Sequence, residues 1–195
     1  VHAEGYYTYA YCDPDYENIA PMFTQVFAGT HAEGYKTTAL DQGAHSEGSK
    51  TYAAYYSHAE GDSTCSVSHA SHAEGYETYA YGESSHAEGS GSKAIGDYSH
   101  AEGSSKAFGK GSHAEGVGTY ASGEKSHAEG CLTSASGEYS HAEGNATYAY
   151  GHNAHAEGCF TSASGEYSHA EGYWTYANGD YSHAEGIYTT AFGNG

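Results

Sequence analysis

The sequence predicts an all-β protein, a parallel β-solenoid whose chain winds through successive coils of about fourteen residues. Three observations support this fold class. The letters SHAEG return along the whole chain, most intervals between them are fourteen residues, and two regularly spaced glycines divide each repeat. A period this short has no room for a pair of helices, and it suits a thin solenoid with two short strands per coil.

The repeat is counted from its histidine, which we call position 0, and its consensus is H-A-E-G-x-x-T-x-A-x-G-x-Y-S. Successive histidines are 14 residues apart, except from His45 to His58 and from His100 to His113, where the step is 13. The longer interval from His2 to His31 is interpreted as holding one degenerate coil at residues 13–30. Residues 1–195 are therefore expected to form a single solenoid domain of fourteen coils.

Each coil is expected to hold two strands, which in the coil of His72 are residues 71–74 and 78–81, with equivalents in every other coil. A glycine ends each strand, at positions 3 and 10, and we expect both to supply the positive φ of a tight turn. Because side chains alternate along a strand, positions 1, 6 and 8 should face inward. Positions 0 and 2 should point outward on one face, and positions 7 and 9 on the other.

Composition narrows the choice of partners. The net charge is −19 with neutral histidines, and it would be −4 if all 15 histidines were protonated. The chain has six lysines and no arginine, which argues against a nucleic-acid partner. No apolar run is long enough for membrane insertion. The cysteines form no CxxC pair, and we expect no disulfide between Cys131 and Cys159 because two coils separate them.

The regular histidines and glutamates are the candidate site. Stacked coils lie about 4.8 Å apart, so a column of bare glutamates would repel by about 3 kcal/mol per neighbouring pair at an effective dielectric near 20. Pairing with protonated histidines would relieve this repulsion and raise the histidine pKa. Because positions 0 and 2 hardly vary, they are predicted to form an interface ladder between chains. The ladder consists of His2, Glu4, His31, Glu33, His45, Glu47, His58, Glu60, His72, Glu74, His86, Glu88, His100, Glu102, His113, Glu115, His127, Glu129, His141, Glu143, His155, Glu157, His169, Glu171, His183 and Glu185.

Two other functions of these residues stay open. No cofactor is predicted, but the alternative is a metal-binding solenoid, because His-x-Glu places an imidazole beside a carboxylate, and both can bind zinc or copper. Catalysis is not expected, since thirteen copies of one environment offer no unique pocket. An ice-binding solenoid is a further alternative, although the repeat threonines are expected to face inward.

The opposite face is predicted to be aromatic. Its outward tyrosines are Tyr79, Tyr81, Tyr120, Tyr148, Tyr150 and Tyr176. Rigid aromatic side chains with a hydroxyl group suit adhesion, stacking on sugars or lateral bundling. Tyrosine is also a common strand residue on a half-exposed surface, so this reading competes with a purely structural one.

The repeat resembles that of the head domains of trimeric autotransporter adhesins (YadA-like heads), whose unit reads roughly Ser-Val-Ala-Ile-Gly-x-x-Ala-x-Ala-x-Gly-x-x. Ser85-His86-Ala87-Glu88-Gly89 stands where that family has Ser-Val-Ala-Ile-Gly, and Ala94 and Gly96 match its later Ala and Gly. Similar His-Ala-Glu-Gly arrays resemble segments of phage tail fibres. The resemblance implies a left-handed parallel β-roll, three chains around a common axis and a role in surface attachment. The Val and Ile of the family are His and Glu here.

These observations predict a structural or adhesive fibre, not an enzyme, at a cell surface, in an extracellular filament or on a virion. The expected partner is the chain itself, as a trimer about a common axis, as a head-to-tail filament, or as both. Head-to-tail stacking is suggested because Gly195 and Val1 are in phase with the repeat. A host surface or a carbohydrate is a further expected ligand, and the chain could also be the stem of a longer protein.

Overall fold

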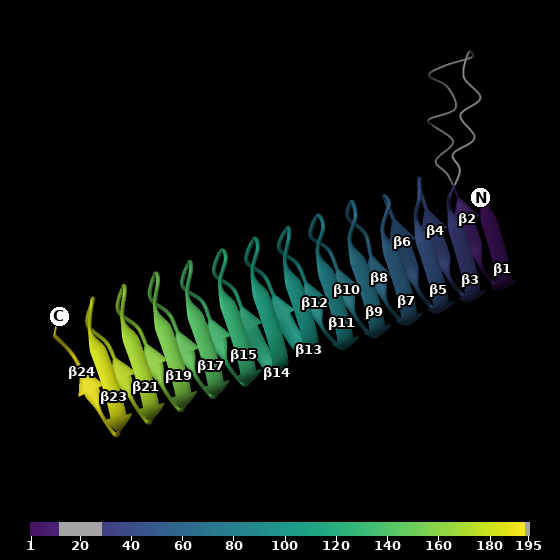
Figure 1. The fold of residues 1–195 in the computed structure, drawn as a ribbon. Helices are drawn as coiled ribbons and strands as arrows, with labels where there is room; N and C mark the ends of the chain where they lie inside the picture. The colour runs from purple at the N-terminus through teal and green to yellow at the C-terminus, as the bar shows by residue number, and fades with distance from the viewer. Residues whose placement is uncertain (12–28, 194–195) are drawn as a thin grey trace, which may run out of the picture.

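The protein is an all-β parallel solenoid, seen in a computed structural model that describes residues 1–11 and 29–193 (Figure 1). Thirteen strands begin at a repeat histidine and form one long column: β1 (His2–Tyr6), β3 (His31–Tyr35), β5 (His45–Ser49), β7 (His58–Asp62), β9 (His72–Tyr76), β11 (His86–Ser90), β13 (His100–Ala107), β14 (His113–Ala121), β15 (His127–Cys131), β17 (His141–Asn145), β19 (His155–Cys159), β21 (His169–Tyr173) and β23 (His183–Ile187). The described part of the chain contains no helix, and so none that could cross a membrane.

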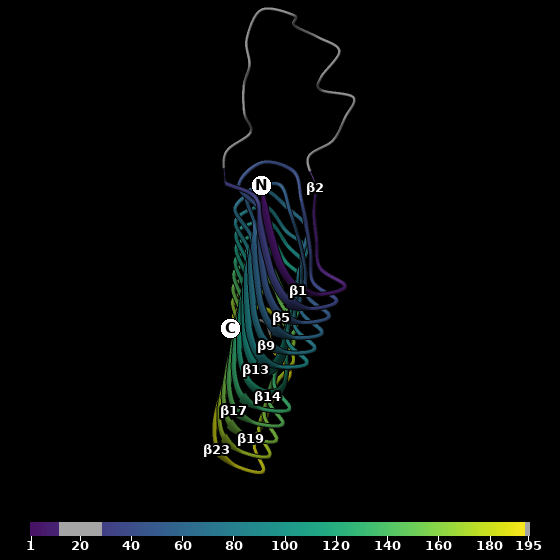
Figure 2. The same ribbon diagram turned by 90° about the vertical axis from the view of Figure 1, so that its right-hand side faces the viewer.

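Shorter strands form the second column, on the opposite side of each coil. They are β2 (Tyr9–Tyr11), β4 (Thr38–Leu40), β6 (Tyr52–Ala54), β8 (Cys65–Ser66), β10 (Tyr79–Ala80), β12 (Lys93–Ala94), β16 (Ser134–Ala135), β18 (Tyr148–Ala149), β20 (Ser162–Ala163), β22 (Tyr176–Ala177) and β24 (Thr190–Ala191). Strands β13 and β14 continue through the turn and belong to both columns. Viewed from the N-terminal side, the coils are nested loops of similar outline (Figure 2).

The strands pair in parallel and in register, so each residue lies beside its equivalent in the next coil. His86 pairs with His100, Ala87 with Ala101 and Glu88 with Glu102, for example. The predicted fold class is thereby confirmed. Twelve steps separate β1 from β23, which gives a stack of about 58 Å at the usual strand spacing.

The expected count of fourteen coils is wrong by one for the stack that the structure describes. The degenerate coil was expected at residues 13–30, and residues 12–28 lie outside the described part. Strand β1 pairs directly with β3, from His2 with His31 to Tyr6 with Tyr35. No coil therefore lies between these two strands.

The core consists of small side chains, as the sequence predicts. The alanines at positions 1 and 8 are buried in all but the terminal coils, and the threonines at position 6 lie between them. Where Ser46 replaces an alanine, its hydroxyl hydrogen-bonds to that of Thr51 at 2.7 Å, so the substitution leaves no unpaired group. Because the threonines are inside, they form no outward array of the kind that the ice-binding alternative needs.

The serine at position 13 is a further core residue, which the alternation argument missed. It is buried in nearly every coil. In Ser85 and Ser126 the hydroxyl donates to the carbonyl oxygen of the position-10 glycine three residues earlier, at 2.7 Å in both cases. This bond closes the second turn, which explains why a serine precedes most of the repeat histidines.

Glycine occupies position 3 in every described coil and position 10 in most of them, for two different reasons. At position 3, Gly144 has φ +117°, and an added Cβ would lie 2.1 Å from the carbonyl oxygen of Gly158. At position 10 the expectation of positive φ is wrong, because Gly137 does not have it. There the constraint is close approach, since a Cβ on Gly137 would lie 1.9 Å from the carbonyl oxygen of Gly151.

The left-handed turn residues stand instead at positions 5 and 12, and most of them are not glycine. Glu77 and Trp174 occupy position 5 with φ of 52° and 56°, and Tyr98 and Tyr181 occupy position 12 with φ of 58° and 55°. This backbone costs roughly 1–2 kcal/mol per residue. Hydrogen bonds between coils oppose that cost, such as the bond from the Tyr98 amide to the Glu83 carbonyl at 2.7 Å.

We predict that replacing Gly144 with alanine lowers the free energy of unfolding by at least about 2 kcal/mol, because the new Cβ would overlap a neighbouring carbonyl. The matched control is Gly91→Ala, since a Cβ on Gly91 would meet nothing within 4 Å and its φ is +77°. That change should cost about 1 kcal/mol. Thermal unfolding followed by circular dichroism measures both, and equal melting temperatures for the two variants would contradict the argument.

Candidate functional site

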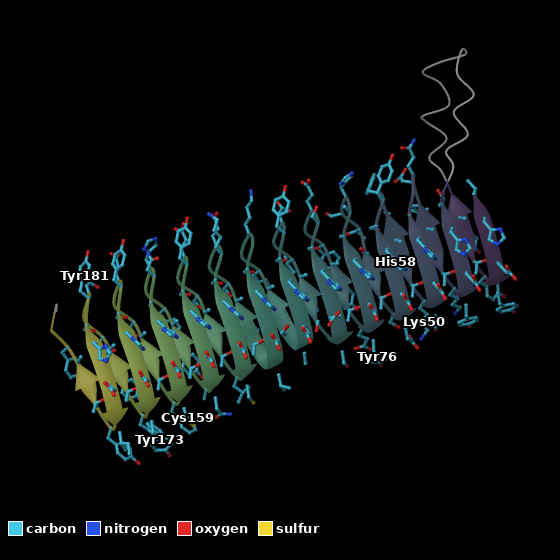
Figure 3. All side chains as sticks on the ribbon, viewed as in Figure 1. Lys50, His58, Tyr76, Cys159, Tyr173 and Tyr181 are labelled. Carbon is cyan, nitrogen blue, oxygen red and sulfur yellow. The ribbon has the colours of Figure 1, made fainter. Side chains whose placement is uncertain are left out.

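The repeat histidines form a continuous stack of imidazole rings along one face of the solenoid (Figure 3). Parallel pairing sets the spacing, and consecutive ring centroids lie 4.6–5.0 Å apart. From His45 to His169 the planes of neighbouring rings are within 20° of each other. One step near each end is tilted, with 74° between His31 and His45 and 58° between His169 and His183, while the rings of His2 and His31 are 14° apart.

The glutamates run beside this stack and are more exposed than the histidines. In ten coils the histidine Nε2 lies 3.3–4.0 Å from a glutamate Oε2 of the same strand. Only His2–Glu4 and His31–Glu33, at 3.4 and 3.3 Å, make hydrogen bonds. The predicted ladder residues therefore do come together as two adjacent columns, but their contact within the chain is loose.

Most of the stacked rings carry a buried nitrogen without a hydrogen-bond partner. The Nε2 atom is buried and unpaired in His45, His58, His72, His86, His100, His113, His127, His141, His155 and His169. A buried polar atom without a partner costs roughly 1–3 kcal/mol. Ten such atoms lie in one row on this face, and the hydroxyls of core threonines such as Thr133 and Thr147 are also buried without a partner.

The pKa of five of the stacked histidines is lowered, which is the opposite of the expected direction. Burial lowers the pKa of His45, His72, His113, His141 and His169, and the neighbouring histidines of the stack lower it further. The nearby glutamates oppose this shift without reversing it. The expectation assumed freely hydrated rings that gain a charge partner, whereas stacking removes water from the rings and places like charges next to one another.

A pH dependence follows from this direction. Because the folded-state pKa of these five histidines is below the unfolded value of about 6.5, the unfolded chain binds more protons, and stability rises with pH in that window. We predict a stability plateau above about pH 6.5 and a falling melting temperature from there to pH 5.5, above the usual range of glutamate. Thermal melts of the wild type, of a His72→Gln, His113→Gln, His141→Gln variant and of the control His152→Gln test this.

The triple variant should lose part of the dependence, whereas the control should keep it because His152 lies at position 11, outside the stack. A melting temperature that rises on acidification from pH 7.5 to 5.5 would show that charge pairing dominates after all.

One part of the ladder offers a metal-like arrangement of ligands. Ligand atoms of Glu88, His100 and Glu102 all lie within 4.8 Å of one another, and the three residues are half-buried. An imidazole and two carboxylates are a donor set that zinc accepts. These three residues therefore fit a divalent ion, which supports the metal-binding alternative at this one step of the ladder.

The opposite face carries the predicted tyrosines, and all six lie partly or fully exposed on it. Tyr79 and Tyr81 have ring centroids 5.8 Å apart, as do Tyr148 and Tyr150. The ammonium groups of two lysines from neighbouring coils lie over tyrosine rings, Lys93 at 4.8 Å from the Tyr79 centroid and Lys106 at 5.1 Å from that of Tyr120. Unlike the ladder, this face changes its residue type from coil to coil.

A second aromatic surface, which was not predicted from the sequence, lies at the edge formed by positions 4 and 5. We call Phe160, Tyr173, Trp174 and Tyr188 the aromatic edge. Neighbouring rings in it have centroids 4.9–6.5 Å apart. All four side chains are exposed, and Tyr173 projects from the edge of the sheet in Figure 3. Aligning the coils by repeat position would have revealed this edge, because it holds Lys36, Lys50 and Glu77 earlier in the chain.

The two cysteines at this edge, Cys131 and Cys159, do not form a disulfide with each other, as expected. Cys131 pairs in the sheet with Asn145, which pairs with Cys159, so one whole coil stands between the two thiols. Both thiols are free and half-buried.

These features define the class of the molecule as a parallel β-solenoid with a repeat of about fourteen residues and a histidine–glutamate face. Comparison with models of known protein families found no match, and neither did comparison with curated proteins. The resemblance to YadA-like heads and to phage tail fibres therefore stays a hypothesis.

Proposed function

We propose that the chain is a structural and adhesive rod that associates with copies of itself through the histidine–glutamate face. It would act outside the cell, in a surface fibre, an extracellular filament or a virion fibre, and it would not be an enzyme. The observation that carries the proposal is the row of ten buried, unpaired Nε2 atoms on this face. These atoms are covered in the isolated chain, so a second chain laid against the face would supply their missing partners once the side chains that cover them turn aside.

The uniformity of the face supports the same reading. All thirteen described coils have histidine at position 0 and glutamate at position 2, whereas positions 7 and 9 vary among tyrosine, serine, lysine and apolar residues. When two parallel rods meet along their length, every coil faces an equivalent coil. Such a contact needs the same side chains in every coil, whereas a face that meets solvent does not.

Electrostatics favours a pairing of neutral histidines with glutamates of another chain. With a lowered pKa, His72, His113 and His141 are mostly neutral near pH 7, and a neutral imidazole can still donate one hydrogen bond to a carboxylate. Burying a carboxylate costs several kcal/mol unless it accepts hydrogen bonds. The resemblance to YadA-like heads favours three chains around an axis as the way in which these bonds are made.

We predict that His113→Ala, His127→Ala and His141→Ala, combined in one chain, convert an oligomer into a monomer at the same concentration. The control combines Tyr120→Ala, Tyr148→Ala and Tyr176→Ala on the opposite face, which should leave the oligomer intact. Light scattering after size exclusion gives the mass, and circular dichroism confirms that both variants fold. A wild-type chain that stays monomeric at high concentration, or dissociation in the control alone, would refute the proposal.

Adhesion is the second part of the proposal, and the aromatic edge carries it. Phe160, Trp174 and Tyr188 have left-handed backbone with φ of 57°, 56° and 56°, where bulky residues are strained. Glu77 and Leu132 have the same backbone at position 5 of other coils, with φ of 52° and 57°, so the turn itself does not call for aromatic residues here. Flat rings in a row are suited to stacking on a carbohydrate of a host surface.

The single tryptophan of the chain, Trp174, is a local reporter of such binding. We predict that oligosaccharides from a panel change its fluorescence, and that Phe160→Ser weakens their binding by about tenfold or more. The control is Tyr150→Ser on the opposite face, which should bind like the wild type. Unchanged emission with every oligosaccharide tested, or equal affinity in both variants, would argue against an adhesive edge.

A further inference from the structure

The coils of the ladder are not all equivalent. The irregular step is the one from β11 to β13. Within the described residues, Glu88, His100 and Glu102 are the one group in which three ligand-type atoms all lie within 4.8 Å of one another. The same three residue types stand at equivalent positions in every other step, so residue type alone does not explain the difference.

The local backbone supplies a reason. The coil of His100 has 13 residues because it lacks the residue of position 5, and the pairing of β13 with β14 shifts between Ser104 and Lys106. The glycines that follow the two glutamates have a changed backbone conformation, with φ of 98° at Gly89 and 88° at Gly103. In the other described coils the position-3 glycines have φ of 111–123°.

This change in backbone coincides with a change in the carboxylates next to it. The Glu88 side chain is 36% exposed, whereas the other glutamates within 4.0 Å of a ladder histidine are 45–71% exposed. Two carboxylates that approach each other in a partly buried place repel, and a bound cation removes the repulsion. The lost residue thus creates a site that the regular coils do not have.

The donor atoms suit a transition metal better than calcium or magnesium. The Nε2 atom of His100 is buried and has no hydrogen-bond partner. His86 does not belong to this group, because its ring is stacked on that of His100, with 4.8 Å between the centroids and 6° between the planes, and two parallel rings cannot both direct a nitrogen lone pair at one ion. Calcium would require six to eight oxygen ligands.

We propose that Glu88, His100 and Glu102 bind one divalent transition-metal ion of the zinc type, with a water molecule as the fourth ligand. All three protein ligands belong to one chain, so binding does not depend on the association proposed above. The ion would join β11 to β13 at the coil where the turn is shortened.

The test is calorimetric titration of the chelator-treated full chain with Zn²⁺ alone at pH 7.5, together with the absorption spectrum of the Co²⁺ complex. We expect about one tight ion per chain and a tetrahedral Co²⁺ spectrum. Glu88→Gln should weaken Zn²⁺ binding at least ~10-fold and remove the rise in melting temperature that Zn²⁺ causes. The matched control Glu143→Gln changes the same repeat position in a regular coil and should bind like the wild type.

Equal affinity in Glu88→Gln and Glu143→Gln, or only weak binding of many ions along the ladder, would overturn the proposal. His100→Asn is the second variant, because it removes the nitrogen ligand while both carboxylates stay. If His100→Asn is folded by circular dichroism and keeps wild-type Zn²⁺ affinity, the site is not the one proposed. A variant that loses Zn²⁺ binding but still forms oligomers would show that the metal site and the association between chains are independent.

Discussion

Hydrogen bonding between equivalent backbone segments, repeated at about 4.8 Å, is the constraint on which the rest of the structure depends. It places every residue beside its own kind, as the pairing of His127 with His141 and of Gly130 with Gly144 shows. Glycines at positions 3 and 10 are required because neighbouring backbones come too close for a Cβ. The core can hold only alanine, threonine and serine because the two strands of one coil lie so near each other.

The same stacking multiplies the chemistry of each position along the rod. One histidine per coil becomes a column of aromatic rings whose Nε2 atoms are mostly buried, and burial and neighbouring rings lower the pKa of members such as His113. One glutamate per coil becomes a row of negative charge on a chain whose net charge is −19. Such columns are costly in isolation, and we propose that a second chain satisfies them by presenting the same columns in return. The exception at Glu88 and His100 arises where the repeat loses one residue.

Much of this could be predicted from the sequence because the period is strict. The fold class, the register, the inward alanines and threonines and the two outward faces all follow from where His72 and its equivalents recur. The serine at position 13 was missed because simple alternation does not describe a turn. The extra coil before His31 was inferred from interval length alone, which cannot distinguish a coil in the stack from other uses of the same residues.

The protonation state of the ladder histidines could not be predicted from the sequence, for a different reason. Spacing shows that Glu115 lies near His113, but it does not show how far stacking removes water from the ring, and this desolvation is the largest cause of the lowered pKa. The aromatic edge was overlooked because Phe160 and Trp174 occupy variable positions of the repeat. The distortion around Gly103 depends on how the chain absorbs a deletion, which only coordinates reveal.

The central claim is that the histidine–glutamate face is the surface by which chains meet. An electron cryo-microscopy map of the assembled protein at neutral pH tests it most directly, because side-chain density identifies which columns lie between rods. The account predicts that the column from His45 to His169 is buried against glutamates of a neighbouring chain, with the tyrosine face outward. A map in which Tyr79, Tyr120 and Tyr148 form the contact while the histidine column faces solvent would contradict it.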